Sequence, residues 1–185
     1  MGSKLNGRTI AFLVAQEGIE EVELTEPRKA VEEAGATTHL IAPEGGEVQA
    51  FNHLDKSSKY KVDRSLEEAD AGDYDGLVLP GGVANPDQLR TDPRAVRFVQ
   101  DFFAAGKPVG VICHGAWTLV EADVVHGRRL TSWPSLQTDI RNAGGEWVDE
   151  EVVVDEALVS SRKPDDLPAF CEAIIEQFEK AEVAA

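Results

Sequence analysis

Short runs of apolar, often β-branched residues alternate along the chain with longer segments in which apolar residues recur every three or four positions. Each short run predicts a buried strand, and each periodic segment predicts an amphipathic helix. The predicted strands cover residues 8–15, 38–43, 74–80, 107–112 and 128–132. The predicted helices cover residues 22–34, 92–106, 115–123, 135–145 and 165–180.

Two segments depart from this alternation. Residues 47–51 and 60–66 have strand-like patterns on either side of a predicted turn at 52–58, and residues 151–162 predict a β-hairpin. Strands that alternate with helices indicate an α/β fold, which we expect to be a flavodoxin-like sandwich with a mainly parallel sheet flanked by helices on both faces. No repeat, linker or low-complexity tract interrupts the pattern, so residues 1–185 are expected to form a single domain.

The chain is strongly acidic, with 34 Asp and Glu residues against 18 Lys and Arg residues and a formal net charge of -16. An acidic surface repels nucleic acid and anionic lipid, so neither nucleic acid nor a membrane is expected as a partner. The first apolar run is too short for a signal peptide, and no window approaches the ~18 apolar residues of a membrane span. Two cysteines far apart in the sequence fit a reduced, cytoplasmic protein.

Cys113 and His114 stand where the predicted strand 107–112 gives way to a helix. A thiol at such an elbow points out of the sheet, and the free N–H groups of the helix N-terminus favour its thiolate. We therefore expect Cys113 to be an ionised nucleophile and not a small buried hydrophobe. His114 suits proton transfer at a bound substrate, but adjacent side chains diverge, so a direct Cys–His hydrogen bond is not expected.

Two other strand ends carry residues that suit the same site, because ligands of open α/β sheets bind beyond the carboxyl ends of the strands. Gly81 and Gly82 follow the strand 74–80. We predict that their backbone N–H groups form an oxyanion hole together with the N–H of His114. The acidic residues of segment 17–23 follow the first strand. A protonated carboxyl among them would donate a hydrogen bond to the thiolate.

Neither a metal nor a cofactor is expected. The four histidines, at positions 39, 53, 114 and 126, form no pair with the spacing of metal ligands. The sequence has neither a Walker loop nor a GxGxxG motif. Cys171 lies on the apolar face of the last predicted helix and is expected in the core.

Several longer motifs together resemble the PfpI superfamily, which includes intracellular cysteine peptidases, glutathione-independent glyoxalases and protein deglycases. The resemblance covers nearly the whole chain as a PfpI-like, class I glutamine amidotransferase-like domain. It rests on EEVEL (20–24), YDGLVLPGG (74–82), ICHGAWTLVEADVVHGRRLTS (112–132), NAGGEWVDEEVVVD (142–155) and SSRKPDDLPAF (160–170).

The resemblance implies roles for individual residues. Cys113 matches the family nucleophile, His114 its adjacent histidine, and Glu20 the carboxylate that hydrogen-bonds the thiol. Asp87 is the nearest match for an acidic residue that reaches across the interface of oligomeric members to the histidine. Trp133, in the pocket, stands where some relatives have a tyrosine, so a tyrosine-dependent role is not expected. Related glutamine amidotransferases place a histidine and a glutamate far downstream, and no histidine follows position 126 here.

The function that the resemblance implies is that of a cofactor-free cysteine enzyme acting on reactive carbonyls such as methylglyoxal or its adducts on amines, in the manner of a glyoxalase or deglycase. One alternative is an intracellular cysteine peptidase that cleaves short peptides. A second is a non-catalytic redox sensor or chaperone, in which Cys113 would be oxidised to a sulfinic acid. A homo-oligomer, either a dimer or a hexamer, is expected in each case.

Overall fold

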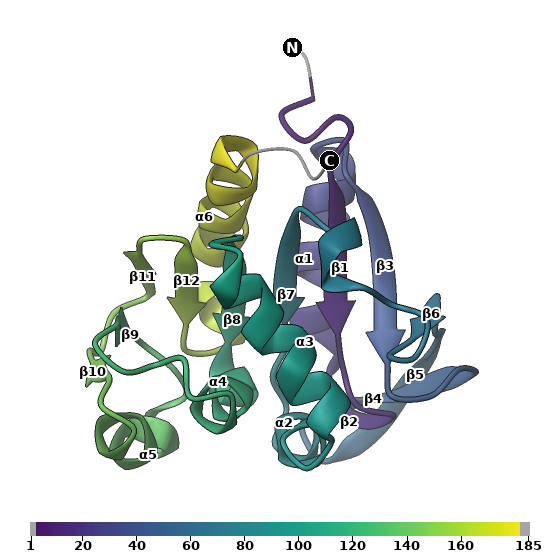
Figure 1. Ribbon diagram of the computed structural model, residues 1–185. Helices are drawn as coiled ribbons and strands as arrows, with labels where there is room; N and C mark the ends of the chain where they lie inside the picture. The colour runs from purple at the N-terminus through teal and green to yellow at the C-terminus, as the bar shows by residue number, and fades with distance from the viewer. Residues whose placement is uncertain (1–2, 182–185) are drawn as a thin grey trace.

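The computed structural model describes residues 3–181 and has a central sheet of seven strands within that range (Figure 1). Its order is β11-β12-β8-β7-β1-β3-β6, and every pairing is parallel except that of β11 with β12. The strands β3, β1, β7, β8 and β12 reproduce the 2-1-3-4-5 order of flavodoxin-like folds. The bounds are β1 Thr9–Leu13, β3 Thr37–Ala42, β6 Arg64–Ser65, β7 Gly76–Leu79, β8 Val109–Ile112, β11 Val152–Asp155 and β12 Leu158–Ser161.

Helices cover both faces of this sheet, because successive strand residues point to opposite sides. Ile10 and Phe12 of β1 belong to one core cluster, which α1 (Glu21–Glu33) and α6 (Leu167–Lys180) cover. Ala11 and Leu13 belong to the other cluster. The second face is covered by α3 (Pro93–Ala104), α4 (Ala116–Glu121) and α5 (Gln137–Asn142). Figure 1 shows α3 and α4 in front of the sheet and α1 behind it, so the predicted α/β sandwich is confirmed.

Helix α6 packs directly on two strand glycines. A Cβ atom at Gly110 would lie 2.6 Å from Cγ2 of Ile174, and one at Gly76 would lie 2.5 Å from the ring of Phe178. Cys171, which we predicted in the core, is only partly buried. It lies beside Glu26 of α1 at the edge of the apolar face, because the buried stripe of α6 runs through Phe170, Ile174 and Phe178.

A smaller sheet stands beside the carboxyl end of β1. It contains β2 (Glu17–Glu20), β4 (Glu47–Asn52) and β5 (Asp55–Lys61), with β2 parallel to β4 and β4 antiparallel to β5. The turn between β4 and β5 is only His53 and Leu54, so the longer turn predicted over 52–58 is wrong. The acidic segment at 17–20 is a strand, because β4 offers it a hydrogen-bonding edge that the sequence pattern does not reveal.

Three further elements remain in the described chain, besides four short 3-10 helices. Helix α2 (Ala84–Leu89) follows the Gly81-Gly82 turn, and the predicted strand near residue 130 is β9 (Arg129–Leu130), which pairs with β10 (Glu146–Trp147). No helix within residues 3–181 has both the length and the hydropathy that crossing a bilayer requires.

Candidate active site

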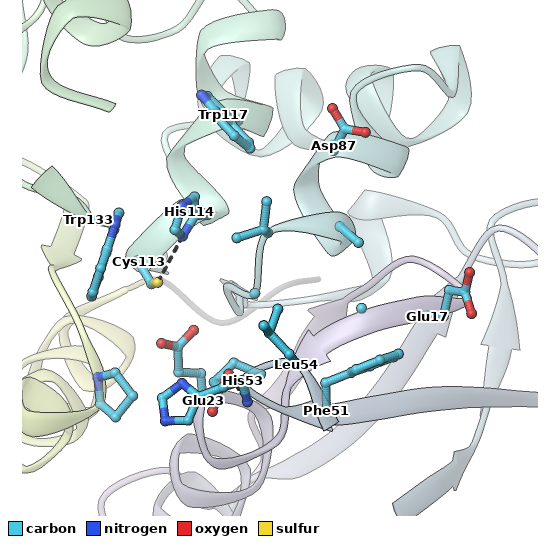
Figure 2. A pocket seen from close by; sticks show the side chains of 16 residues that line it. Glu17, Glu23, Phe51, His53, Leu54, Asp87, Cys113, His114, Trp117 and Trp133 are labelled. Atoms are coloured by element: carbon cyan, nitrogen blue, oxygen red, sulfur yellow. Dashed lines mark hydrogen bonds between the residues drawn. The ribbon is translucent and has the colours of Figure 1, made fainter. Parts of the chain in front are cut away.

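A pocket of about 780 Å³ opens where β1, β7 and β8 end, and Figure 2 shows it from close by. The ends of parallel strands meet at this edge of the sheet, as expected for a ligand site of an α/β fold. It is lined by Glu17, Gly18, Glu20, Glu23, Phe51, His53, Leu54, Gly82, Val83, Ala84, Asp87, Cys113, His114, Trp117, Trp133 and Pro164.

Cys113 stands at the turn between β8 and the following short helix, Cys113–Gly115. Its φ of 61° lies in the left-handed region, which non-glycine residues seldom adopt and which is often found at functional turns. The turn lies against the end of β7, since a Cβ atom at Gly115 would be 2.8 Å from the carbonyl oxygen of Leu79. This geometry is the predicted strand–turn–helix elbow, with the residue Cys113 6% exposed at the base of the pocket.

The carboxyl group beside the thiol belongs to Glu23, so the prediction that Glu20 holds this position is wrong. Glu23 lies within hydrogen-bonding reach of Cys113, and its Oε2 accepts the backbone N–H of Gly81 at 2.8 Å. Figure 2 shows its side chain directed toward the sulfur. The carboxylate of Glu20 instead accepts the backbone N–H of His53 at 3.1 Å.

The point at which helix α1 begins explains why Glu23, and not Glu20, lies beside the thiol. Strand β2 ends at Glu20, so Glu20 precedes the helix with an extended backbone, whereas Glu23 lies in the first helical turn. Glu23 is four and eight residues before the buried Pro27 and Val31 and therefore shares their inward face. That spacing is the signal in the sequence that identifies Glu23.

Burial controls the protonation of Glu23. The pKa of the carboxyl group is raised from 4.5 to about 8, mainly by burial and to a smaller extent by the nearby charge of Glu20, while the hydrogen bonds from Cys113 and Gly81 oppose the shift. Among the described residues, Oε1 of Glu23 has no hydrogen-bond partner. Since Oε2 accepts the Gly81 N–H, Oε1 is the oxygen left to carry the proton at neutral pH.

The Cys113 thiol is protonated at rest, contrary to our prediction of an ionised thiolate. Burial raises its pKa above the ordinary value, and the negative charge that Glu23 acquires above its own pKa raises it further. The backbone N–H groups of His114 and Gly82 act in the opposite direction, as the helix-terminus argument predicted, but they do not outweigh burial.

The backbone N–H groups of Gly81 and Gly82 are donated to different partners. The N–H of Gly81 is donated to Glu23, so it does not belong to the predicted oxyanion hole. The N–H of Gly82 is directed at the Cys113 sulfur together with that of His114. Gly82 has a φ of 85°, and a Cβ atom there would collide with the carbonyl oxygen of Gly18 and lie 2.7 Å from the backbone nitrogen of Glu20.

His114 contacts the thiol directly, so the expectation that the two side chains diverge is wrong. Nδ1 of His114 lies 3.2 Å from the sulfur, because the left-handed backbone at Cys113 turns the two neighbours toward each other. The imidazole is stacked on Trp133 with ring centroids 5.7 Å apart, and its other side contacts the edge of Trp117 at 5.3 Å. Burial lowers the pKa of His114, so the ring is neutral at pH 7.

The remaining pocket residues form its rim. Trp133 donates its backbone N–H to the carbonyl of Cys113 at 3.1 Å, which holds the indole beside the active-site turn. Asp87 lies exposed on α2 at the mouth of the pocket. Sequence reasoning missed His53, Leu54 and Trp117, and the first two come from a strand turn that only the β2–β4 pairing brings to the site.

Within residues 3–181, no group of three or more histidine, cysteine, aspartate or glutamate side chains is arranged to hold a metal ion.

Comparison with known proteins gives consistent results. A sequence profile of the DJ-1/PfpI family matches residues 8–177. The chain is 43% identical to "Protein/nucleic acid deglycase 2" of Escherichia coli over 164 residues, which is 88% of this chain and 93% of that protein. It is 41% identical to "Putative cysteine protease YraA" of Bacillus subtilis over 163 residues, 88% of this chain and 94% of that protein. A crystal structure of a ThiJ/PfpI domain protein from Brachyspira murdochii shares the fold, with a TM-score of 0.88, 21% identity and coverage of 96% of this chain and 99% of that one.

Proposed function

The chain belongs to the DJ-1/PfpI family, and from this premise we propose that it is a cofactor-free cysteine enzyme that acts on reactive carbonyl compounds as a deglycase or glyoxalase. One observation supports this function above all others. A single pocket holds a thiol on a left-handed elbow, a buried carboxyl group with a pKa near neutrality and an imidazole 3.2 Å from the sulfur. These are a nucleophile and two groups able to exchange protons.

The first step is attack of Cys113 on the aldehyde carbon of methylglyoxal. As the S–C bond forms, the thiol proton passes to Nδ1 of His114, which lies next to it, so no resting thiolate is required. The N–H groups of Gly82 and His114, which are directed at the sulfur in the resting site, would stabilise the new oxyanion, which then takes the proton from the imidazolium. The product of this step is a neutral hemithioacetal.

The second step converts the hemithioacetal into a thioester of lactate. His114 removes the proton of the former aldehyde carbon while Glu23 protonates the ketone oxygen, giving an enediol. The imidazolium then protonates the second carbon, and the Glu23 carboxylate takes the proton of the first hydroxyl, which restores both residues. A pKa of about 8 suits Glu23 to give and regain a proton near neutral pH.

Water then hydrolyses the thioester and releases lactate and the thiol. The balance is methylglyoxal plus water giving lactate, without an external oxidant. An adduct of methylglyoxal on an amine enters the same route when the thiol displaces the amine from the adduct carbon. That displacement releases the repaired amine and forms the same hemithioacetal.

Peptide hydrolysis is a second candidate function, because a relative 41% identical to this chain is named a putative cysteine protease. In that reaction Cys113 would attack a peptide carbonyl, and His114 would protonate the leaving amine. A redox sensor is a weaker candidate, since oxidation follows thiolate character and burial raises the pKa of the Cys113 thiol.

We also propose the setting in which the enzyme works. Its substrates are small carbonyl compounds, glycated amines or short peptides, and its acidic surface disfavours nucleic acid and membranes. A cytoplasmic homo-oligomer, dimer or hexamer, would allow the exposed Asp87 to approach the histidine of a neighbouring subunit. Sedimentation velocity measures that assembly.

Incubation with methylglyoxal and assay of lactate tests the proposed function. The wild type is expected to form lactate and Cys113→Ala to form none, while Cys171→Ala, which changes the thiol outside the pocket, keeps the activity. Fluorogenic peptides and peroxide are tested in parallel. Cleavage of peptides without lactate formation would establish the peptidase, and peroxide adding mass at Cys113 with neither activity would establish the sensor.

A further inference from the structure

Exposed apolar side chains gather at the mouth of the pocket. Among the described residues, five large hydrophobic side chains are exposed, and three of them line this one pocket. Leu54 is 94% exposed, Val83 58% and Trp133 38%. Exposed apolar groups concentrated around a concave site mark a surface that an apolar ligand covers.

The volume of the pocket also indicates a ligand with a substantial apolar group. Its volume of about 780 Å³ lies in the range of roughly 300–1,000 Å³ that is typical of sites for drug-sized ligands. Methylglyoxal has three carbon atoms and fills only a small part of that space. A substrate that fills the pocket therefore carries a larger group next to its reactive carbonyl.

The β4–β5 turn that carries Leu54 is held in place by several hydrogen bonds. His53 has a left-handed φ of 58°, and its N–H is donated to the Glu20 carboxylate at 3.1 Å. The side-chain amide of Gln49 donates to the carbonyl oxygens of Ala50 at 2.8 Å and Ser57 at 2.9 Å. The turn thus forms a fixed wall of the pocket, which Figure 2 shows on the side opposite His114 and Trp117.

We infer that the pocket selects carbonyl compounds whose reactive carbon is next to an apolar substituent of aromatic or branched aliphatic size, and that the β4–β5 turn is the element that selects it. This inference rests on the proposed function and names its substrate class. Leu54 and Val83 would contact the substituent while the carbonyl carbon lies at Cys113. Glu20 is a positioning residue, because it acts through the backbone of His53.

The experiment compares kcat/KM for phenylglyoxal and for methylglyoxal. The wild type is expected to favour phenylglyoxal by about tenfold, the scale of discrimination that apolar contacts provide. Leu54→Ser is expected to abolish most of this preference, whereas Val154→Ser, which changes an exposed apolar residue outside the pocket, keeps it. Glu20→Ala is expected to lower the preference and Glu20→Gln to restore it, because the glutamine oxygen still accepts the His53 N–H.

Equal turnover of the two aldehydes, with no effect of Leu54→Ser on their ratio, would overturn the inference. So would a Leu54→Ser variant that only dissociates an oligomer in sedimentation experiments, since the rim would then be covered by a second copy of the chain. If neither aldehyde is turned over, the proposed function fails. The inferred preference for an apolar substituent is then tested separately, by measuring the binding of acetophenone by calorimetry. Binding that weakens in Leu54→Ser supports the inference, and absence of binding to the wild type contradicts it.

Discussion

At the scale of single residues, the three side chains that exchange protons in the proposed mechanism are all uncharged in the resting site. Burial raises the pKa values of Cys113 and Glu23 and lowers that of His114, so none of the three is charged at neutral pH. A low-dielectric pocket makes each isolated charge costly, and proton transfer between neighbours avoids that cost. In the proposed mechanism, the nucleophile is therefore formed only when a carbonyl carbon is present to receive the sulfur.

The substitution Glu23→Gln is expected to make the Cys113 thiol easier to alkylate and to slow lactate formation. The substitution removes the carboxylate charge that raises the pKa of Cys113, so the pH profile of iodoacetamide alkylation is expected to move to lower pH. Lactate formation is expected to fall at least ~100-fold, the usual loss when a proton-transfer group is removed. Glu20→Gln is the control for the loss of a neighbouring negative charge. A Glu23→Gln variant that retains full turnover would remove Glu23 from the mechanism.

The residues that sequence reasoning placed correctly are those fixed by a strand end. Cys113, His114 and Gly82 follow buried apolar runs directly, so the topology alone brings them to one edge of the sheet. Glu20 was assigned from the resemblance of the EEVEL motif, but it is the last residue of β2 and lies outside the helix. The spacing of Glu23 to the buried Pro27 and Val31 places its side chain on the inward face of α1 instead.

At the scale of elements, the close contact of β2 with the Gly82 turn predicts a sharp difference between two glycines. Gly82 and Gly46 have similar φ values of 85° and 89°, but only a Cβ atom at Gly82 meets backbone. Gly46→Ala is expected to cost about 1–2 kcal/mol, the conformational penalty alone. Gly82→Ala is expected to cost more in urea unfolding and to lower turnover about 100-fold, because the Gly82 N–H moves away from the sulfur. Equal effects of the two substitutions would contradict this packing.

The elements of the main sheet and its helices were predictable because their apolar residues are periodic and their sheet is buried on both faces. The β2–β4–β5 sheet was not fully predictable. Strand β2 has two acidic residues among four, and its extended conformation comes from pairing with β4, whose partner residues lie 31 or 32 positions later in the chain. Helix α2, six residues long with a proline, gives an equally weak signal.

At the scale of the whole molecule, Glu23 makes folding stability depend on pH. Below pH 4.5 the folded and unfolded states both hold its proton, and above about pH 8 both have lost it. Between these limits only the folded state holds the proton, so stability is lost as the pH rises, by on the order of 5 kcal/mol. Urea unfolding at pH 5.5 and pH 8.5 spans about 2.5 pH units of this range and is expected to show a loss of roughly 3 kcal/mol, which Glu23→Gln is expected to reduce. An unchanged pH dependence in that variant would contradict the assignment.

Helix α6 follows every strand of the sheet in the sequence, and this order has a consequence for synthesis. Until residues 167–180 have left the ribosome, nothing covers the strand surface around Gly76 and Gly110 where Ile174 and Phe178 pack. The nascent polypeptide therefore carries an open apolar surface until α6 emerges, and this interval exposes it to aggregation and to chaperone capture.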